Sequence, residues 1–282
     1  MTDTWDPSQP ILEIKNLSIS FFTRLREIPA VMDFSCTVMA GEAMGLVGES
    51  GCGKSTVALA VMRDLGVNGR IVDGTITFKG RDLTTMSQEE LRHLRGSEIA
   101  MIYQEPMASL NPAMTIGAQL AEVPMIHEGM SKTNAWALAR QIVADVRLPD
   151  ADRIVNAYPH QLSGGMRQRV MIAIALACEP DILIADEPTT ALDVTIQAEI
   201  MDLLQQLCET ENMGLILITH DLGVVSQVTE KIAVMYAGKI IEFGLTDRVV
   251  HTPVHPYTIG LIGSIPGSTA PDGPGRTARA YT

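Results

Sequence analysis

The chain has 282 residues, 46% of them hydrophobic, so it can bury a large core and is expected to form one domain with a smaller lobe. Its formal net charge of −12 opposes binding to nucleic acid, whose phosphate backbone requires a basic surface. The start resembles no signal peptide, and the longest apolar run, residues 170–178, has about half of the roughly 20 residues of a membrane span. We therefore expect a soluble, cytoplasmic protein that serves a membrane only through partners.

The four cysteines are scattered along the chain at Cys36, Cys52, Cys178 and Cys208. They form neither a CxxC pair nor any spacing typical of a metal site. Free thiols in a reducing compartment are expected.

Strand and helix signals alternate up to residue 103. Apolar residues alternate with polar ones over 12–21, apart from a slip at Asn16, which indicates a strand of a peripheral sheet. The remaining elements expected here are strands over 43–47, 75–78 and 99–103 and helices over 55–65 and 84–96.

The pattern changes between Gln104 and about Leu162, where strand signals vanish and prolines recur. Residues 134–146 have the apolar spacing of an amphipathic helix. This stretch is a candidate helical lobe. Beyond it, all-apolar runs over 182–185 and 215–218 are typical of strands buried on both faces of a parallel sheet.

Two further strands, over 232–236 and 239–243, are joined by Ala237-Gly238 and predict a hairpin. Residues 1–10 are expected to be a loose tail. From residue 263 onward Gly, Pro, Ser and Thr dominate, and residues 263–282 are expected to lack fixed structure. The chain has no internal repeat, so we expect one nucleotide-binding unit.

Residues 48–55 are the most informative stretch of the chain. They fit the phosphate-binding loop pattern of two glycines flanking four residues, followed by Lys-Ser. Glycines let backbone N–H groups turn toward an anion, Lys54 adds a charge for the outer phosphates, and the Ser55 hydroxyl can ligate Mg²⁺. The stretch lies between a predicted strand and helix, where the helix N-terminus adds partial positive charge. The expected nucleotide contacts are Gly48, Glu49, Ser50, Gly51, Cys52, Gly53, Lys54, Ser55 and Thr56.

A second group of residues ends the predicted strand over 182–185. Asp186 is placed to hold Mg²⁺, directly or through water, and Glu187 to polarise an attacking water. Strands often end in charged residues, so the pair is informative mainly because a phosphate loop lies upstream.

The octamer Leu162-Ser163-Gly164-Gly165-Met166-Arg167-Gln168-Arg169 contains a third signal. Ser163 is a candidate N-cap, and the glycines leave N–H groups bare ahead of a helix expected to run through Cys178. This arrangement predicts a second anion site, although the octamer alone is also compatible with a plain capped helix after a Gly-rich turn.

Together these motifs resemble the ATP-binding cassette family over roughly residues 11–262. Leu-Ser-Gly-Gly is similar to its signature motif, Gln104 to its Q-loop glutamine, Ala191-Leu192-Asp193 to its D-loop and His220 to its switch histidine. The resemblance implies a P-loop NTPase (RecA-like) α/β core with an antiparallel β subdomain and a helical subdomain inserted at about 104–175.

The resemblance also implies a mechanism in which two cassettes dimerise head to tail. Each ATP then lies between one chain's phosphate loop and the other's signature turn, with Ser163, Gly164, Gly165 and Asp193 as contacts. Glu187 would be the general base or water-positioning group, His220 would bind the γ-phosphate, and Gln104 would sense Mg²⁺. The implied catalytic residues are Glu187, His220, Lys54 and Gln104, and the implied metal-site residues are Ser55, Gln104 and Asp186. Phe21 is the expected adenine-stacking residue, with Phe22 as a competitor and a core aromatic as the alternative.

Longer motifs resemble a narrower group, the ATPases of dipeptide, oligopeptide and nickel importers. They include Tyr103-Gln104-Glu105-Pro106, Tyr158-Pro159-His160-Gln161 and His255-Pro256-Tyr257-Thr258. Met166 stands where Gln is commoner in the signature motif, and this feature resembles the first of the two unlike ATPases in such importers. The resemblance implies a heterodimer with a second ATPase on the cytoplasmic face of the membrane. It also implies two transmembrane permease subunits and a solute-binding protein acting indirectly. The acidic net charge predicts no nucleic acid partner.

Some members of that group hold an iron–sulfur cluster in a cysteine-rich C-terminal region. No cysteine follows Cys208 here, so we expect no cluster. The cargo stays open: small peptides are favoured, with nickel, sugars or opines as alternatives. The competing functions are a soluble cassette ATPase acting on DNA or ribosomes, a phosphate-loop kinase or GTPase, and a regulatory cassette that does not hydrolyse ATP.

Overall fold

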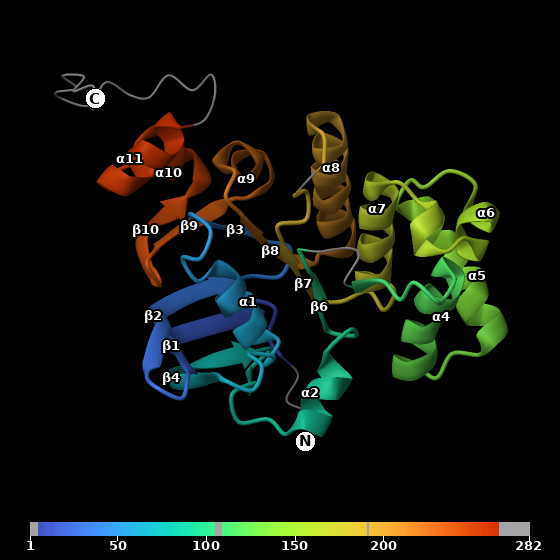
Figure 1. Ribbon diagram of the computed structural model, residues 1–282, viewed down its shortest axis with the longest axis horizontal. Coiled ribbons are helices and arrows are strands. Elements are labelled where there is room, and N and C mark those ends of the chain that lie inside the picture. The colour runs from blue at the N-terminus through green and yellow to red at the C-terminus, as the bar shows by residue number, and fades with distance from the viewer. Residues whose placement is uncertain (1–4, 105–108, 191, 265–282) are drawn as a thin grey trace.

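The protein is described by a computed structural model covering residues 5–104, 109–190 and 192–264. Two sheets form its centre (Figure 1). The first is antiparallel, in the order β2-β1-β4-β5, and the second has the order β10-β9-β3-β8-β7-β6. The strands of the first sheet are β1 (Leu12–Phe22), β2 (Glu27–Val38), β4 (Gly69–Phe78) and β5 (Arg81–Asp82). Those of the second are β3 (Ala43–Val47), β6 (Ile99–Ile102), β7 (Ile182–Asp186), β8 (Gly214–Thr219), β9 (Lys231–Tyr236) and β10 (Lys239–Leu245).

Helices surround the second sheet, and a group of them stands apart from it on one side (Figure 1). This group comprises α4 (Ile116–His127), α5 (Lys132–Asp145) and α6 (Ala151–Asn156), and α7 (Gly164–Ala175) connects it to the core. The remaining helices are α1 (Lys54–Val61), α2 (Gln88–Leu94), the short η1 (Pro159–Gln161), α8 (Val194–Glu211), α9 (Leu222–Val228), α10 (Thr246–His251) and α11 (Pro256–Gly263).

The predicted buried strands are confirmed. Every residue of β3, β7 and β8 is buried, and these strands pair in parallel with one another, as the all-apolar runs indicated. Their carboxyl ends therefore meet at one edge of the sheet, next to the phosphate loop and the Asp-Glu pair.

Two irregularities in the sequence correspond to bends in the backbone. Asn16, where the alternation slips, has φ 50 and lies at a shift of register in β1. Asn tolerates this left-handed conformation, so the bulge returns the later apolar residues to the buried face. The predicted hairpin is also confirmed, since Ala237 and Gly238 both have positive φ and join β9 to β10 in a two-residue turn.

The predicted helix over 134–146 is confirmed as α5, and it begins two residues earlier because Ser131 accepts a hydrogen bond from the Asn134 N–H. Other boundaries were wrong. The helix after the phosphate loop ends at Val61 rather than at residue 65, because Arg63 adopts φ 52. The one expected over 84–96 is only α2, which a capping box of Ser87 and Glu90 starts.

The sequence analysis missed β2. Its apolar pattern is irregular because Asp33 has φ 53 and shifts the faces of the strand, and Pro29 lies near its start. At the N-terminus, Trp5 packs against the core of the antiparallel sheet and donates to the Pro10 carbonyl oxygen. The expected C-terminal tail lies outside the described residues except for residues 263 and 264.

All four cysteines are free. Within the described ranges, no helix is long and apolar enough to cross a membrane.

Candidate nucleotide site

The phosphate loop leaves the buried end of β3 and enters α1. Gly48 has φ 155, and a Cβ there would lie 2.3 Å from the Met235 carbonyl oxygen, so a side chain is excluded. At Gly53, with φ 111, a Cβ would lie 2.8 Å from the Ala30 carbonyl oxygen. The backbone therefore passes closely between β2 and β9, as only glycine permits.

Lys54 is the first residue of α1, and only 5% of it is exposed. Its ammonium group donates to the carbonyl oxygens of Gly48, at 2.7 Å, and Glu49, at 3.0 Å. The loop thus folds around the ammonium group of Lys54, which would be available to the phosphates of a bound nucleotide.

Asp186 ends β7, and its carboxylate lies close to the Ser55 side chain. Burial raises its pKa, and the neighbouring charge of Glu187 adds to the rise, while Ser55 and Lys54 oppose it. The Oδ1 atom of Asp186 is buried and lacks a hydrogen-bond partner within the described structure. Such an oxygen beside a serine hydroxyl fits Mg²⁺, a hard cation that binds carboxylate and hydroxyl oxygens.

Glu187 is the centre of a small polar cluster. One oxygen of its carboxylate accepts from Gln104 Nε2 at 3.2 Å and from Thr190 Oγ1 at 2.8 Å. The other lies 3.3 Å from His220 Nδ1. The structure thus brings together three residues that the sequence analysis singled out from separate segments, and it adds Thr190, which that analysis missed.

The backbone of Glu187 is unusual, with φ 48, and its N–H donates to the Ile218 carbonyl oxygen at 2.8 Å. A glutamate in the left-handed backbone conformation costs free energy, and such strain is common at functional sites. This conformation turns the Glu187 side chain away from the direction of the strand, toward Gln104 and His220.

The signature residues lie apart from the phosphate loop. Ser163 is the N-cap of α7 and accepts from the Met166 N–H at 3.3 Å, as predicted, although the helix ends at Ala175 rather than at Cys178. Asp193 caps α8 in the same way, accepting from the Ile196 N–H at 2.9 Å.

Both caps border one hollow of about 460 Å³. Ser163, Gly164, Gly165 and Asp193 line it, but no residue of the phosphate loop does. Of the D-loop, Ala191 lies outside the described residues. The two predicted anion sites are therefore not joined within one chain.

Phe21 lies near the end of β1, where it is half-buried between Ile28 of β2 and Gly69 of β4. Its neighbour Phe22 is 36% exposed. Adenine stacking by Phe21 stays a prediction.

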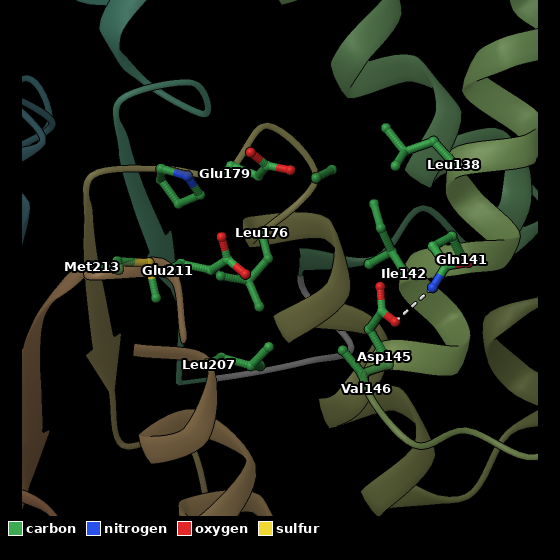
Figure 2. Close-up of a pocket in the computed structure, with 12 residues that line it drawn as sticks. Leu138, Gln141, Ile142, Asp145, Val146, Leu176, Glu179, Leu207, Glu211 and Met213 are labelled. Carbon is green, nitrogen blue, oxygen red and sulfur yellow. Dashed lines mark hydrogen bonds between the residues drawn. The ribbon is translucent and has the colours of Figure 1, made fainter. Parts of the chain in front are cut away.

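The hollow in Figure 2 belongs to a different part of the protein. Leu138, Leu176 and Leu207 are among its apolar lining residues, and Asp145 and Glu211 are among its acidic ones. It lies where β7 and β8 begin, at the opposite edge of the sheet from the phosphate loop, and contains none of the predicted site residues.

This fold, with its phosphate loop, Asp-Glu pair and separate signature turn, defines an ATP-binding cassette ATPase. A profile described as "ABC transporter" matches residues 31–190, more than half of the chain. The chain belongs to the ABC transporter family.

Curated relatives agree with this assignment. The oligopeptide transport ATP-binding protein OppD of Salmonella typhimurium is 50% identical over 94% of this chain and 79% of its own length. The dipeptide transport ATP-binding protein DppD of Lactococcus lactis is 49% identical over 92% of this chain and 74% of its own length.

A solved structure has the same fold. The cassette MJ0796, in a dimeric post-hydrolysis state bound to ADP and Pi, has a TM-score of 0.75 and 27% identity, over 83% of this chain and 98% of its own. Its nucleotide agrees with the site described here. This chain is accordingly an ABC ATPase whose cofactors are ATP and Mg²⁺.

Proposed function

We propose that this chain hydrolyses ATP to power the import of small solutes, with dipeptides or oligopeptides as the cargo. The relatives named for peptide transport support the cargo class. The observation that carries the catalytic part is the cluster of Gln104, Glu187 and His220 beside Asp186.

In this proposal, Glu187 is the general base or positions the attacking water. Its carboxylate is already oriented by Thr190 and faces both Gln104 and His220, so the three groups converge on one point. His220 is 62% exposed at its side chain and can reach the γ-phosphate.

Lys54 and the N-terminus of α1 stabilise the charge that spreads over the phosphoryl oxygens. Ser55 and Asp186 would hold Mg²⁺, which would neutralise negative charge on the phosphates. Gln104 Nε2 lies 3.2 Å from the Glu187 carboxylate, and Gln104 would sense both the ion and the water.

The second half of each site comes from another chain. Ser163 and Asp193 border an open hollow that no phosphate-loop residue reaches, which is the arrangement expected of a surface that closes on a companion's ATP. We propose that the companion is a second, unlike ATPase subunit, and that ATP drives their dimerisation.

The membrane partners would be two permease subunits, met at the cytoplasmic face. A mostly apolar hollow of about 350 Å³ lies between β6, α4 and α7, next to Gln104, and it offers a place for an apolar segment of a permease. Tyr103, Leu110, Val123 and Ile174 are among its lining residues. A solute-binding protein would act on the other side of the membrane, without contact to this chain.

Glu187→Gln tests the catalytic assignment. Substitution should leave ATP binding intact but reduce turnover by several orders of magnitude, because the amide cannot accept a proton from water. Turnover is measured in the assembled complex with the companion's own site disabled. Glu209→Gln, on the exposed face of α8, is the matched control and should hydrolyse ATP normally. Wild-type turnover by Glu187→Gln would refute the role.

Co-purification tests the transport assignment independently. Extraction of the tagged chain in detergent should recover two membrane proteins and a second cassette. Association that nuclease treatment abolishes would instead support a cassette acting on nucleic acid.

A further inference from the structure

The segment 255–258, which the sequence singles out without a role, lies against the phosphate loop. The Glu49 N–H donates a hydrogen bond to the Tyr257 hydroxyl at 3.0 Å, across 208 positions of the chain. Glu49 was expected to contact the nucleotide, but its N–H is already partnered within the protein. The last described helix, α11, therefore reaches the site through one side chain.

The bond acts on a peptide unit that is also held from its other side. The Gly48 carbonyl and the Glu49 N–H belong to the same planar peptide group and point in opposite directions. The carbonyl oxygen accepts from Lys54 Nζ at 2.7 Å, while the N–H donates to Tyr257. The orientation of this peptide thus determines where the ammonium group is held.

We propose that Tyr257 is a positioning residue of the ATP site, which fixes the Gly48–Glu49 peptide so that its carbonyl faces Lys54. Without the hydroxyl, the N–H would bond to water, and the peptide would be free to rotate about the adjacent glycine. Lys54 would then lose a fixed acceptor. Without nucleotide, the loop would adopt its phosphate-binding conformation less often.

The Tyr257 side chain is itself held firmly. Its ring packs against that of Tyr236 with centroids 4.7 Å apart. The backbone N–H of Tyr257 donates to His255 Nδ1 at 3.1 Å. The Glu242 carboxylate accepts from the N–H groups of Val254 and His255 at 2.8 and 3.1 Å. These contacts tie the start of α11 to β9 and β10, so the hydroxyl has little freedom.

The turn between β9 and β10 holds the loop at a second point, since the Gly238 N–H donates to the Cys52 carbonyl oxygen at 2.9 Å. The hairpin and α11 together form one wall of the phosphate loop. A movement of α11 relative to the core would therefore change the affinity for ATP.

The test compares two tyrosine-to-phenylalanine variants of the full chain. In Tyr257→Phe the affinity for a non-hydrolysable ATP analogue should fall about threefold to tenfold, the range expected for one hydrogen bond. In the assembled complex, KM for ATP should rise by a similar factor while kcat at saturating ATP stays unchanged. Tyr236→Phe is the matched control, because within the described residues its hydroxyl has no hydrogen bond, and it should bind like the wild type.

A second measurement addresses the loop directly. Hydrogen exchange at the Glu49 amide should be faster in Tyr257→Phe and unchanged in Tyr236→Phe. Wild-type affinity and KM for Tyr257→Phe would overturn the proposal. So would a lowered melting temperature with unchanged affinity, or equal losses in both variants, since each points to general packing rather than to the loop.

Discussion

At the scale of single residues, Asp186 shows what the proposed metal site costs in stability when no ion is bound. Its carboxylate is buried at the end of β7, one oxygen lacks a partner among the described groups, and burial raises its pKa. A raised pKa means that folding favours the protonated form. Folding thus disfavours the charged carboxylate relative to the unfolded chain, and this is the form that Mg²⁺ would bind.

We predict that Asp186→Asn is at least as stable as the wild type without Mg²⁺ and ATP, and that it hydrolyses no ATP. The stability of the wild type relative to this variant should fall as pH rises from below the unfolded-state pKa through the raised folded-state pKa. Urea unfolding of both proteins between pH 3.5 and 8 measures the difference. A lower stability of the variant across this range would contradict the account of Asp186.

At the scale of elements, the position of α7 determines where the signature turn lies. Arg169 of this helix is 8% exposed and donates to Glu199 of α8 at 2.7 Å and to the Val146 carbonyl oxygen at 3.1 Å. One guanidinium group thus ties α7 both to α8, whose cap is Asp193, and to the end of α5.

We expect Arg169→Ala to lower the free energy of unfolding by about 2 kcal/mol, less than for a fully buried pair because Glu199 is half-exposed and can hydrate. Arg140→Ala is the control: its partner Asp152 is 80% exposed, and loss of this surface pair should cost under about 1 kcal/mol. Denaturant titration measures both. Equal losses of stability in the two variants would show that Arg169 contributes no more than a surface ion pair.

Elements and motifs differed in how far the sequence predicted them. β3, β7 and β8 were predictable because strands buried on both faces are apolar throughout. β2 was not, because a left-handed Asp33 breaks its alternation, and such turns of the backbone depend on the neighbouring strand.

The same distinction holds for the site. The phosphate loop and the Asp-Glu pair are contiguous, so their chemistry is visible in the order of residues. The roles of Gln104 and His220 were expected only from family resemblance, and their contacts with Glu187 were not predicted, because the three residues come from different strand ends. The bond between Tyr257 and Glu49 had no local signal, because it joins segments about 200 positions apart.

At the scale of the whole molecule, the described chain presents one phosphate loop and one signature turn that do not meet. The hollow beside Ser163 and Asp193 is open, and the loop that holds Lys54 lies elsewhere, among β2, β9 and α11. The central claim is that each ATP is enclosed by two chains.

The most direct test measures ATP turnover per chain over a range of protein concentrations, with sedimentation followed in the same samples. We predict negligible turnover where the chain sediments as a monomer, and a steep rise when a companion cassette is added and a dimer forms. Full turnover by a strict monomer would contradict the account.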